Sequence, residues 1–147
     1  MAYRTISITT DQPVQEGIAS GTIYPGMALE RTSTADTVQP HSVADGAVNA
    51  RLVAVEDEWQ GRGIATAYTA ANRCFFKSFQ PGDEAYMRIA SGQNIAVGDE
   101  LTSNGDGYLK KKVNDSSSGD MDKTVFGVAL EAANCLAAAG LCRVQVA

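Results

Sequence analysis

The stretch from Val97 to Lys112, VGDELTSNGDGYLKKK, most tightly limits what this chain can fold into. Its Asn-Gly and Asp-Gly pairs at residues 104–107 supply the positive φ angles that tight hairpin turns require. The stretch therefore predicts two short antiparallel strands whose connecting turn contains Gly105 and Gly107. The VFGVALE run at residues 125–131 follows after a polar gap and predicts a further strand.

The same turn pattern occurs in three segments of the chain. They read IYPGMALERT over 23–32, QPGDEAYM over 80–87 and AVGDELT over 96–102. In the first, Pro25–Gly26 fits the two central positions of a type II turn, because the second position needs the positive φ that glycine accepts. The unequal spacing does not make a solenoid period. We therefore expect a mainly β fold, a compact antiparallel β-barrel or sandwich with short helical turns.

The remaining segments are assigned from periodicity and turn residues. Strands are expected at 51–55, 73–79, 87–90 and 142–146, loops at 11–20 and 113–123, and an alanine-rich turn or short helix at 132–139.

The N-terminus alternates β-branched and polar residues, with Ile6 and Ile8 separated by Ser7. Such alternation indicates either a strand with one buried face or an extended arm that pairs with another subunit. We divide the chain into an extended N-terminal arm over residues 1–12 and a single domain over 13–147. Tyr3, Ile6 and Ile8 of the arm are candidate interface residues.

Composition limits the function classes. With 147 residues, 44% of them hydrophobic and 20% charged, the chain is expected to be globular. The net charge is −5 and Lys110–Lys112 is the one cationic cluster, which is better explained as a solvated face than as a phosphate contact, so direct nucleic-acid binding is not expected. An apolar run of about 20 residues and a signal-peptide core are lacking, so we expect no membrane partner and synthesis in the cytoplasm.

Catalytic and metal-binding residues are sparse. His41 is the single histidine, and Ser42 and Asp45 are ordinary neighbours, so a surface histidine in a loop is the preferred interpretation. An enzyme built on a trimeric β-barrel, with its active site at subunit boundaries, would use aspartates as active-site residues. Each of these aspartates is also explained by a turn-capping role. These are Asp83, Asp99 and Asp106.

The three cysteines form no CxxC pair, so neither a zinc site nor any other cofactor is expected. A bridge between Cys135 and Cys142 is an alternative, but a cytoplasmic origin favours free thiols packed as small apolar side chains, Cys74 included.

The segment EDEWQGRGI at residues 56–64 holds an acidic cluster beside the single tryptophan. A solvated turn is the preferred interpretation, with a subunit contact and then a metal or catalytic role as alternatives. If it is a contact, the candidate interface residues are Glu56, Asp57, Trp59 and Arg62.

Taken together, the succession LVAVEDEWQGRGIATAY, RCFF, PGDEAYMRIASGQNIAVGDELTSNGDGYLKK, VFGVALEAA and RVQV resembles the decoration, or cement, proteins of tailed bacteriophages. The resemblance covers roughly residues 24–147. The chain departs from the pattern in the DSSSGDMDK insert and in the alanine- and cysteine-rich segment 134–142.

The resemblance implies a non-enzymatic protein on the outer surface of the phage head, assembled in the host cytoplasm. It implies a homotrimer that stabilises the shell by bridging subunits of the major capsid protein, with no cofactor. A phage tail or fibre attachment module is the nearest alternative, and the trimeric β-barrel enzyme is the more distant one.

Overall fold

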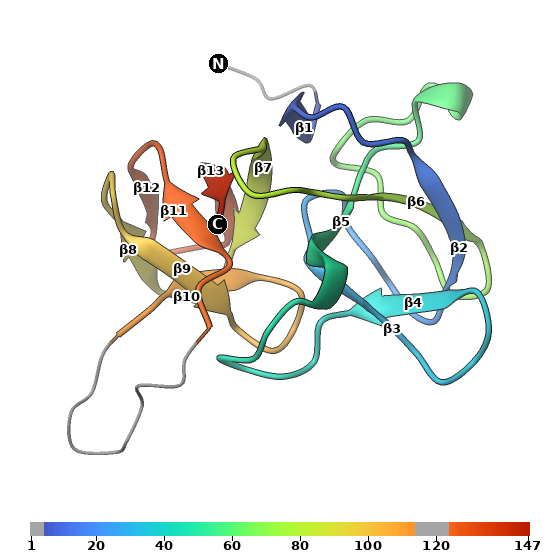
Figure 1. The fold of residues 1–147 in the computed structure, drawn as a ribbon, viewed down its shortest axis with the longest axis horizontal. Helices are drawn as coiled ribbons and strands as arrows, with labels where there is room; N and C mark the ends of the chain where they lie inside the picture. The colour runs from blue at the N-terminus through green and yellow to red at the C-terminus, as the bar shows by residue number, and fades with distance from the viewer. Residues whose placement is uncertain (1–4, 114–123) are drawn as a thin grey trace.

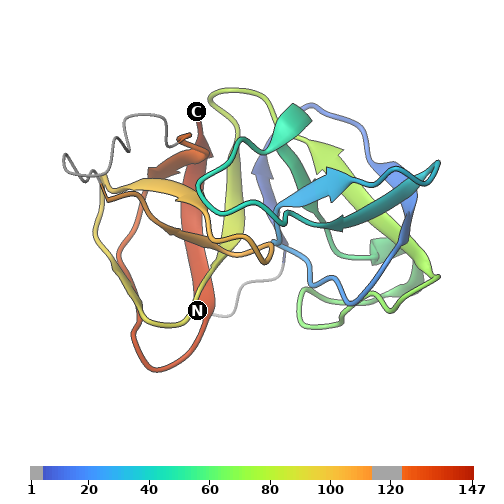
Figure 2. The same ribbon diagram turned by 90° about the horizontal axis from the view of Figure 1, so that it is seen from below.

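The computed structural model of the protein describes residues 5–113 and 124–147. Two β-rich lobes lie side by side, an N-terminal lobe with β2 to β6 and a C-terminal lobe with β1 and β7 to β13 (Figures 1 and 2). The N-terminal lobe contains β2 (Gln15–Ala19), β3 (Leu29–Arg31), β4 (Thr37–Pro40), η1 (Asn49–Arg51), β5 (Leu52–Ala54), η2 (Glu58–Gln60) and β6 (Arg73–Ser78). The C-terminal lobe contains β1 (Ser7–Thr9), β7 (Glu84–Ile89), β8 (Gln93–Ile95), β9 (Glu100–Ser103), β10 (Leu109–Lys111), β11 (Gly127–Ala129), β12 (Ala133–Cys135) and β13 (Gly140–Val146).

Five strands of the C-terminal lobe close into a barrel. Their order is β7-β10-β9-β11-β13, and β13 returns to pair with β7. β13 alternates as its sequence predicts, with Cys142, Val144 and Val146 buried in the barrel. Closure leaves these strands without a free edge, which removes the surface on which sheets aggregate.

The N-terminal lobe is a nearly closed barrel. Its sheet has the order β3-β4-β2-β6-β5, and a single bridge between Ala28 and Val53 brings the two edge strands together. The mainly β, barrel-like fold with short helical turns predicted from the sequence is therefore confirmed.

The three predicted turns share one geometry. In each, the fourth residue donates its N–H to the carbonyl of the first: Met27 to Tyr24, Asp83 to Gln80 and Asp99 to Ala96. The third residue is a glycine with φ near 90° in all three, as type II turns require. In the second and third turns the aspartate also accepts the N–H of the first residue, and in the first turn the Met27 sulfur takes that place.

The two lobes meet along a continuous hydrophobic core. Gly26, with φ of 92°, sits at this seam, where a Cβ would lie 3.1 Å from the Tyr86 carbonyl oxygen. Arg88 of β7 crosses the seam, donating to the carbonyls of Pro25 and Ile64 at 2.7 and 2.8 Å while its guanidinium lies over the Tyr24 ring. The seam thus holds the lobes together through both packing and hydrogen bonds.

Two predictions of local structure are wrong. Residues 11–20 contain β2 rather than only a loop, because Gly17 lets the strand pack closely against Phe76 and Asp36. A Cβ at this position would lie 3.0 Å from an atom of each. The alanine-rich segment forms β12, paired with β8, rather than a helical turn. In both cases a tertiary partner overrides weak local preference. Most of the predicted 113–123 loop, residues 114–123, lies outside the described residues.

The described part of the N-terminal arm packs on its own chain. β1 pairs antiparallel with β7 and carries a bulge between Ser7 and Thr9, and the Ile6 side chain is fully buried in the core. The strand prediction is thus confirmed within the subunit, while pairing with another subunit and the boundary at residue 12 stay predictions.

Candidate functional site

The candidate site is the surface around Trp59, on η2 at the outer corner of the N-terminal lobe (upper right in Figure 1). Four of the sequence-predicted interface residues join Trp59 there: Ile8 and Glu56 on one side of it, Asp57 and Arg62 on the other. Ile6 does not belong to this surface, because it is buried in the core. Tyr3 lies outside the described residues.

Trp59 is oriented by a neighbouring ring although it is 83% exposed. Its ring lies parallel to that of Phe75, with centroids 6.4 Å apart and planes 7° apart. Phe75 comes from β6 and is itself buried, so the stack fixes one face of the indole and leaves the other toward solvent. A large exposed aromatic side chain with a fixed orientation is typical of a protein-binding anchor.

Two hollows flank Trp59. The first, called the β1 hollow, has a volume of about 310 Å³ and lies between β1 and η2. The second, called the Arg62 hollow, has a volume of about 470 Å³ and lies on the side of β2 and β6. The β1 hollow is lined in part by Ser7, Ile8, Glu56, Glu58, Trp59 and Lys77, and the Arg62 hollow in part by Glu16, Asp57, Trp59, Arg62 and Arg73.

The acidic cluster is not the solvated turn preferred from sequence. Glu56 and Asp57 are 6% and 5% exposed. Glu56 Oε2 accepts the backbone N–H of Ile6 at 3.1 Å. This hydrogen bond links the segment before η2 to the segment before β1. Asp57 accepts the N–H of Gln60 and caps η2, while Glu58 and Trp59 project outward. Glu56 and Asp57 are therefore buried while Glu58 is exposed, and the contact between Glu56 and Ile6 is one that sequence spacing does not reveal.

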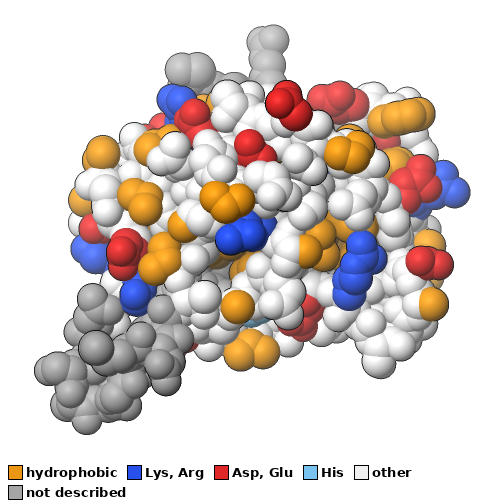
Figure 3. Space-filling model, in the orientation of Figure 1, with side chains coloured by type: hydrophobic (Ala, Val, Ile, Leu, Met, Phe, Trp, Pro, Cys, Tyr) orange, Lys and Arg blue, Asp and Glu red, His pale blue; other side chains and the backbone are white. Residues whose placement is uncertain are grey.

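Sequence reasoning missed two exposed apolar residues: Val14, which precedes β2 and lines the β1 hollow, and Ile18 in β2. Val14 and Ile18 are 42% and 41% exposed, and the register places Ile18 opposite Arg73 on β6. Glu16, which lies between Val14 and Ile18 in the sequence, forms an ion pair with Arg73 at 3.5 Å. The strand and its exposed apolar side chains could have been predicted from the sequence pattern of residues 14–18, but that segment was assigned to a loop. Charges of both signs are similarly interspersed over the face shown in Figure 3.

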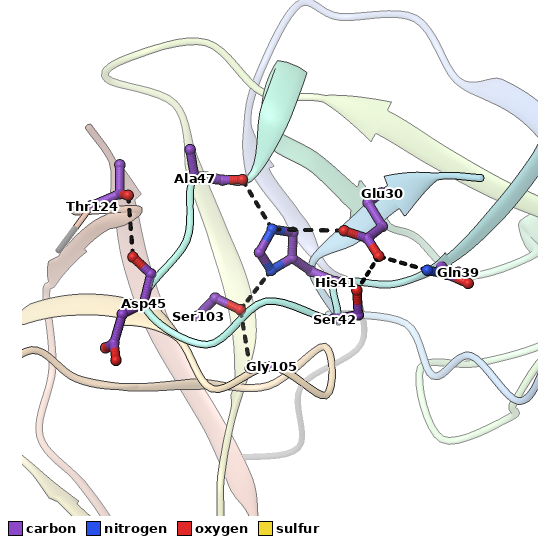
Figure 4. Close-up of polar contacts among 9 residues, drawn as sticks. All are labelled: Glu30, Gln39, His41, Ser42, Asp45, Ala47, Ser103, Gly105 and Thr124. Atoms are coloured by element: carbon purple, nitrogen blue, oxygen red, sulfur yellow. Dashed lines mark hydrogen bonds and ion pairs between the residues drawn. The ribbon is translucent and has the colours of Figure 1, made fainter. Parts of the chain in front are cut away.

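His41 is buried, so the prediction of a surface histidine is wrong. Figure 4 shows its ring between Ala47 and Ser103. Nε2 lies 2.9 Å from the Ala47 carbonyl oxygen, and Nδ1 lies 2.7 Å from the Ser103 hydroxyl oxygen. The backbone of His41 also joins the lobes, because it donates to Ala28 and accepts from Gly107. The burial arises from β9, a distant strand that the local sequence does not indicate.

The neutral imidazole satisfies every group around it. A carbonyl only accepts, so Nε2 carries the hydrogen bonded to Ala47, and Nδ1 accepts the Ser103 hydroxyl. The Ser103 oxygen in turn accepts the Gly105 N–H at 3.1 Å. A Glu30 carboxylate oxygen lies 3.9 Å from Nε2, and the carboxylate accepts hydrogen bonds from Ser42 and Gln39. Partial burial acts to raise the pKa of Glu30, but these hydrogen bonds outweigh it and the pKa is lowered.

The Ser103, His41 and Glu30 side chains join the two lobes and do not form a catalytic set. Ser103 and His41 are 1% and 3% exposed, and neither contributes to the lining of the hollows described above. A nucleophile needs access to substrate, and Ser103 has none.

The aspartates weighed for an enzyme have turn-capping roles. Asp83 accepts the N–H of Gln80 and the hydroxyl of Thr10, Asp99 accepts the N–H of Ala96, and Asp106 accepts the N–H of Tyr108. They lie on separate turns of the C-terminal lobe.

The three consecutive lysines each face a carboxylate. The pairs are Lys110 with Asp45 at 3.3 Å, Lys111 with Asp99 at 3.1 Å and Lys112 with Glu100 at 3.5 Å. The run is therefore locally neutralised, but the solvated face predicted from the sequence holds only for Lys111, because the Lys110 and Lys112 side chains are 26% and 14% exposed.

The cysteines are free and buried, as predicted: Cys74, Cys135 and Cys142. Burial raises the pKa of the Cys74 and Cys142 thiols to about 12. Over residues 5–113 and 124–147, no cluster of three or more His, Cys, Asp or Glu side chains is placed to hold a metal ion. Within the same ranges, the helices are too short and polar to cross a membrane.

Comparison with solved structures finds a likeness over nearly the whole chain. No family model and no curated protein matches the sequence. The fold is similar to the crystal structure of the head fiber gp8.5 N base of bacteriophage phi29, with a TM-score of 0.59. The match covers 92% of this chain and 94% of that chain at 16% identity, so it shows a shared fold over both lobes.

Proposed function

We propose that this chain is a structural, non-enzymatic protein of a tailed-bacteriophage head that binds the outer surface of the shell and stabilises it by bridging major capsid protein subunits. The observation that carries the proposal is the shared fold, over nearly the whole chain, with the base of a phage head fibre. The sequence resemblance to decoration proteins supports the same conclusion independently.

The geometry suits a clamp. A protein that spans a seam between capsid subunits must resist being pulled apart, and here two barrels are joined by the Arg88 hydrogen bonds and the buried His41 bonds. Many modest contacts spread over several copies give firm attachment without one strong site. We therefore propose that the chain acts as a homotrimer on the capsid.

The surface around Trp59 is the attachment face in this proposal. It combines a fixed aromatic side chain, flanking hollows and the exposed Val14 and Ile18, and interface hot spots are enriched in tryptophan. Ile8, Glu56, Asp57 and Arg62 surround the anchor and would set its specificity.

A second function is favoured by the same likeness. The matched structure is itself the base of a head fibre. This chain would then seat a fibre on the head, with attachment to the shell through the same face and a further protein bound at another.

Copy number and heat resistance test the proposal. Heads of the encoding phage, prepared with and without this chain, are compared by quantitative mass spectrometry and by heating. We expect the chain in hundreds of copies per particle, spread over the head, and earlier DNA release from heads that lack it. A few copies at the tail end of the particle, or none on heads, would contradict both functions; unchanged heat resistance at high copy number would favour the fibre base.

A further inference from the structure

Glu56 presents a buried carboxylate to the β1 hollow. The residue is 6% exposed, and its Oε2 is bonded to the Ile6 N–H. Within residues 5–113 and 124–147, no basic side chain forms an ion pair with Glu56. A buried charge without an opposite charge is costly, and the cost is recovered when a cation reaches it.

Trp59 forms a wall of the same hollow. Its indole is fixed by the stack on Phe75, and cations bind favourably over an indole face. Glu58 adds a second, exposed carboxylate at the rim. From this arrangement we infer that the β1 hollow is a receptor for one arginine or lysine side chain of a partner protein, held by Glu56 and Trp59.

The charge of the lining favours a cationic occupant. Two carboxylates, Glu56 and Glu58, face one cation, Lys77, in the β1 hollow. Lys77 lines the hollow without an ion pair to either carboxylate at 4.0 Å or less. It weakens the field for an incoming cation but does not neutralise Glu56 directly.

The occupant is identified as a side chain on a protein and not as a free ion. The volume of about 310 Å³ exceeds what a single bare cation fills, and the aromatic wall complements the flat guanidinium or the aliphatic stem of a lysine. This inference rests on the proposed function for the identity of the partner, which is the capsid protein beneath the attachment face.

Trp59 is the only tryptophan in the chain, so its fluorescence reports directly on the site. The first experiment titrates the full chain with N-acetyl-argininamide and, in parallel, with its uncharged isostere N-acetyl-citrullinamide. We expect a saturable change in Trp59 emission with the arginine compound and an at least tenfold weaker response with the citrulline compound. Equal responses to the two compounds would overturn the inference.

Matched variants assign the response to the hollow. Glu56→Gln keeps an acceptor for the Ile6 N–H and removes the charge, so it should fold normally and lose the argininamide response at least tenfold. Glu16 has its carboxylate in the Arg62 hollow, so Glu16→Gln is the control and should respond to argininamide as the wild type does. A response unchanged in Glu56→Gln would contradict the inference.

Lys77 of the chain itself is a rival occupant. If Lys77 neutralised Glu56, wild-type protein would not respond to argininamide, and Lys77→Gln would gain the response. That gain would overturn the inference. We expect instead a wild-type response that Lys77→Gln strengthens by about two- to threefold, as removal of a nearby like charge implies.

Binding to heads separates this inference from the proposed function. Wild type and Glu56→Gln are added to heads that lack the chain, and the bound fraction is measured. Loss of binding in Glu56→Gln alone supports both claims, and equal binding of the two contradicts only the arginine receptor. Absence of binding by wild type contradicts the proposed function, while the argininamide titration still decides the chemistry of the hollow.

Discussion

Trp59 lies parallel to Phe75 and offset from it, with ring centroids 6.4 Å apart and planes 7° apart, although Trp59 is 83% exposed and Phe75 is buried. The pair couples the attachment face to the core, because the residue that would meet a partner is oriented by one that holds β6 in place. The two side chains should therefore respond differently to truncation.

Trp59→Ala should weaken binding to heads by tenfold or more and change the free energy of unfolding by less than about 1 kcal/mol, since little surface is buried. Phe75→Ala should lower the free energy of unfolding by about 3 kcal/mol, as large-to-small core substitutions do. Denaturant unfolding and head-binding assays measure both. A Trp59→Ala variant that binds heads normally would remove Trp59 from the attachment face.

Gly26 should be far less tolerant of alanine than Gly82, although both have positive φ, 92° and 95°. Alanine at either site has an unfavourable backbone conformation costing about 1 kcal/mol. At Gly26 its Cβ would also press on the Tyr86 carbonyl oxygen at 3.1 Å and on Ile6, whereas at Gly82 nothing lies within 4 Å. We expect Gly26→Ala to lose at least about 1 kcal/mol more than Gly82→Ala in urea unfolding; equal losses would contradict the tight seam.

Loss of the His41 ring should destabilise the seam between the lobes. His41→Ala leaves the Ser103 hydroxyl and the Ala47 carbonyl without their partner, and each buried unsatisfied group costs about 1–3 kcal/mol. Ser103→Ala should cost less than His41→Ala, because Nδ1 and the Gly105 N–H lose their partner while the Ala47 bond remains. Thermal unfolding checks the order, and a reversed order would contradict the role of the His41 ring in joining the lobes.

Asp99 should contribute stability that depends on pH. Its pKa is lowered mainly by the N–H of Ala96 and further by Lys111, so the ionised form is favoured in the folded state. The contribution is present above the ordinary aspartate pKa and is lost as pH falls through the lowered value. Asp99→Asn should therefore cost up to about 1 kcal/mol at pH 7, with the difference from wild type shrinking toward pH 3. A difference that grows in acid would contradict this account.

The thiols should be unreactive in the folded protein. Burial raises the pKa of Cys74 and Cys142 to about 12, and the thiolate is the reacting species. At pH 8 iodoacetamide should leave both unmodified in native protein and label all three cysteines in denaturant, as mass spectrometry can show. Rapid labelling of Cys74 in the native state would indicate that β6 opens.

The sequence predicted features whose causes are local. The glycines of the three turns and of the β9–β10 hairpin need a positive φ wherever the chain goes, so Gly26 and Gly105 could be placed without a structure. The stretch around Trp59 was singled out for its acidic cluster beside the single tryptophan, and its role as a subunit contact stays a prediction.

What the sequence did not predict depends on distant partners. β2 needs Phe76 to pack over Gly17, and the buried state of His41 needs Ser103, 62 residues away. Glu56 is buried where it accepts the N–H of Ile6, 50 residues back in the chain. The β1 hollow is thus a product of tertiary structure, although three of its lining residues, Ile8, Glu56 and Trp59, were candidate interface residues from the sequence.

Electron cryo-microscopy of heads carrying this chain tests the central claim most directly. The account predicts density for the two lobes at junctions between neighbouring major capsid protein subunits on the outer shell, with Trp59 and the β1 hollow buried against the capsid. Density confined to the tail end of the particle, or lobes seated on the shell with Trp59 facing solvent, would contradict it.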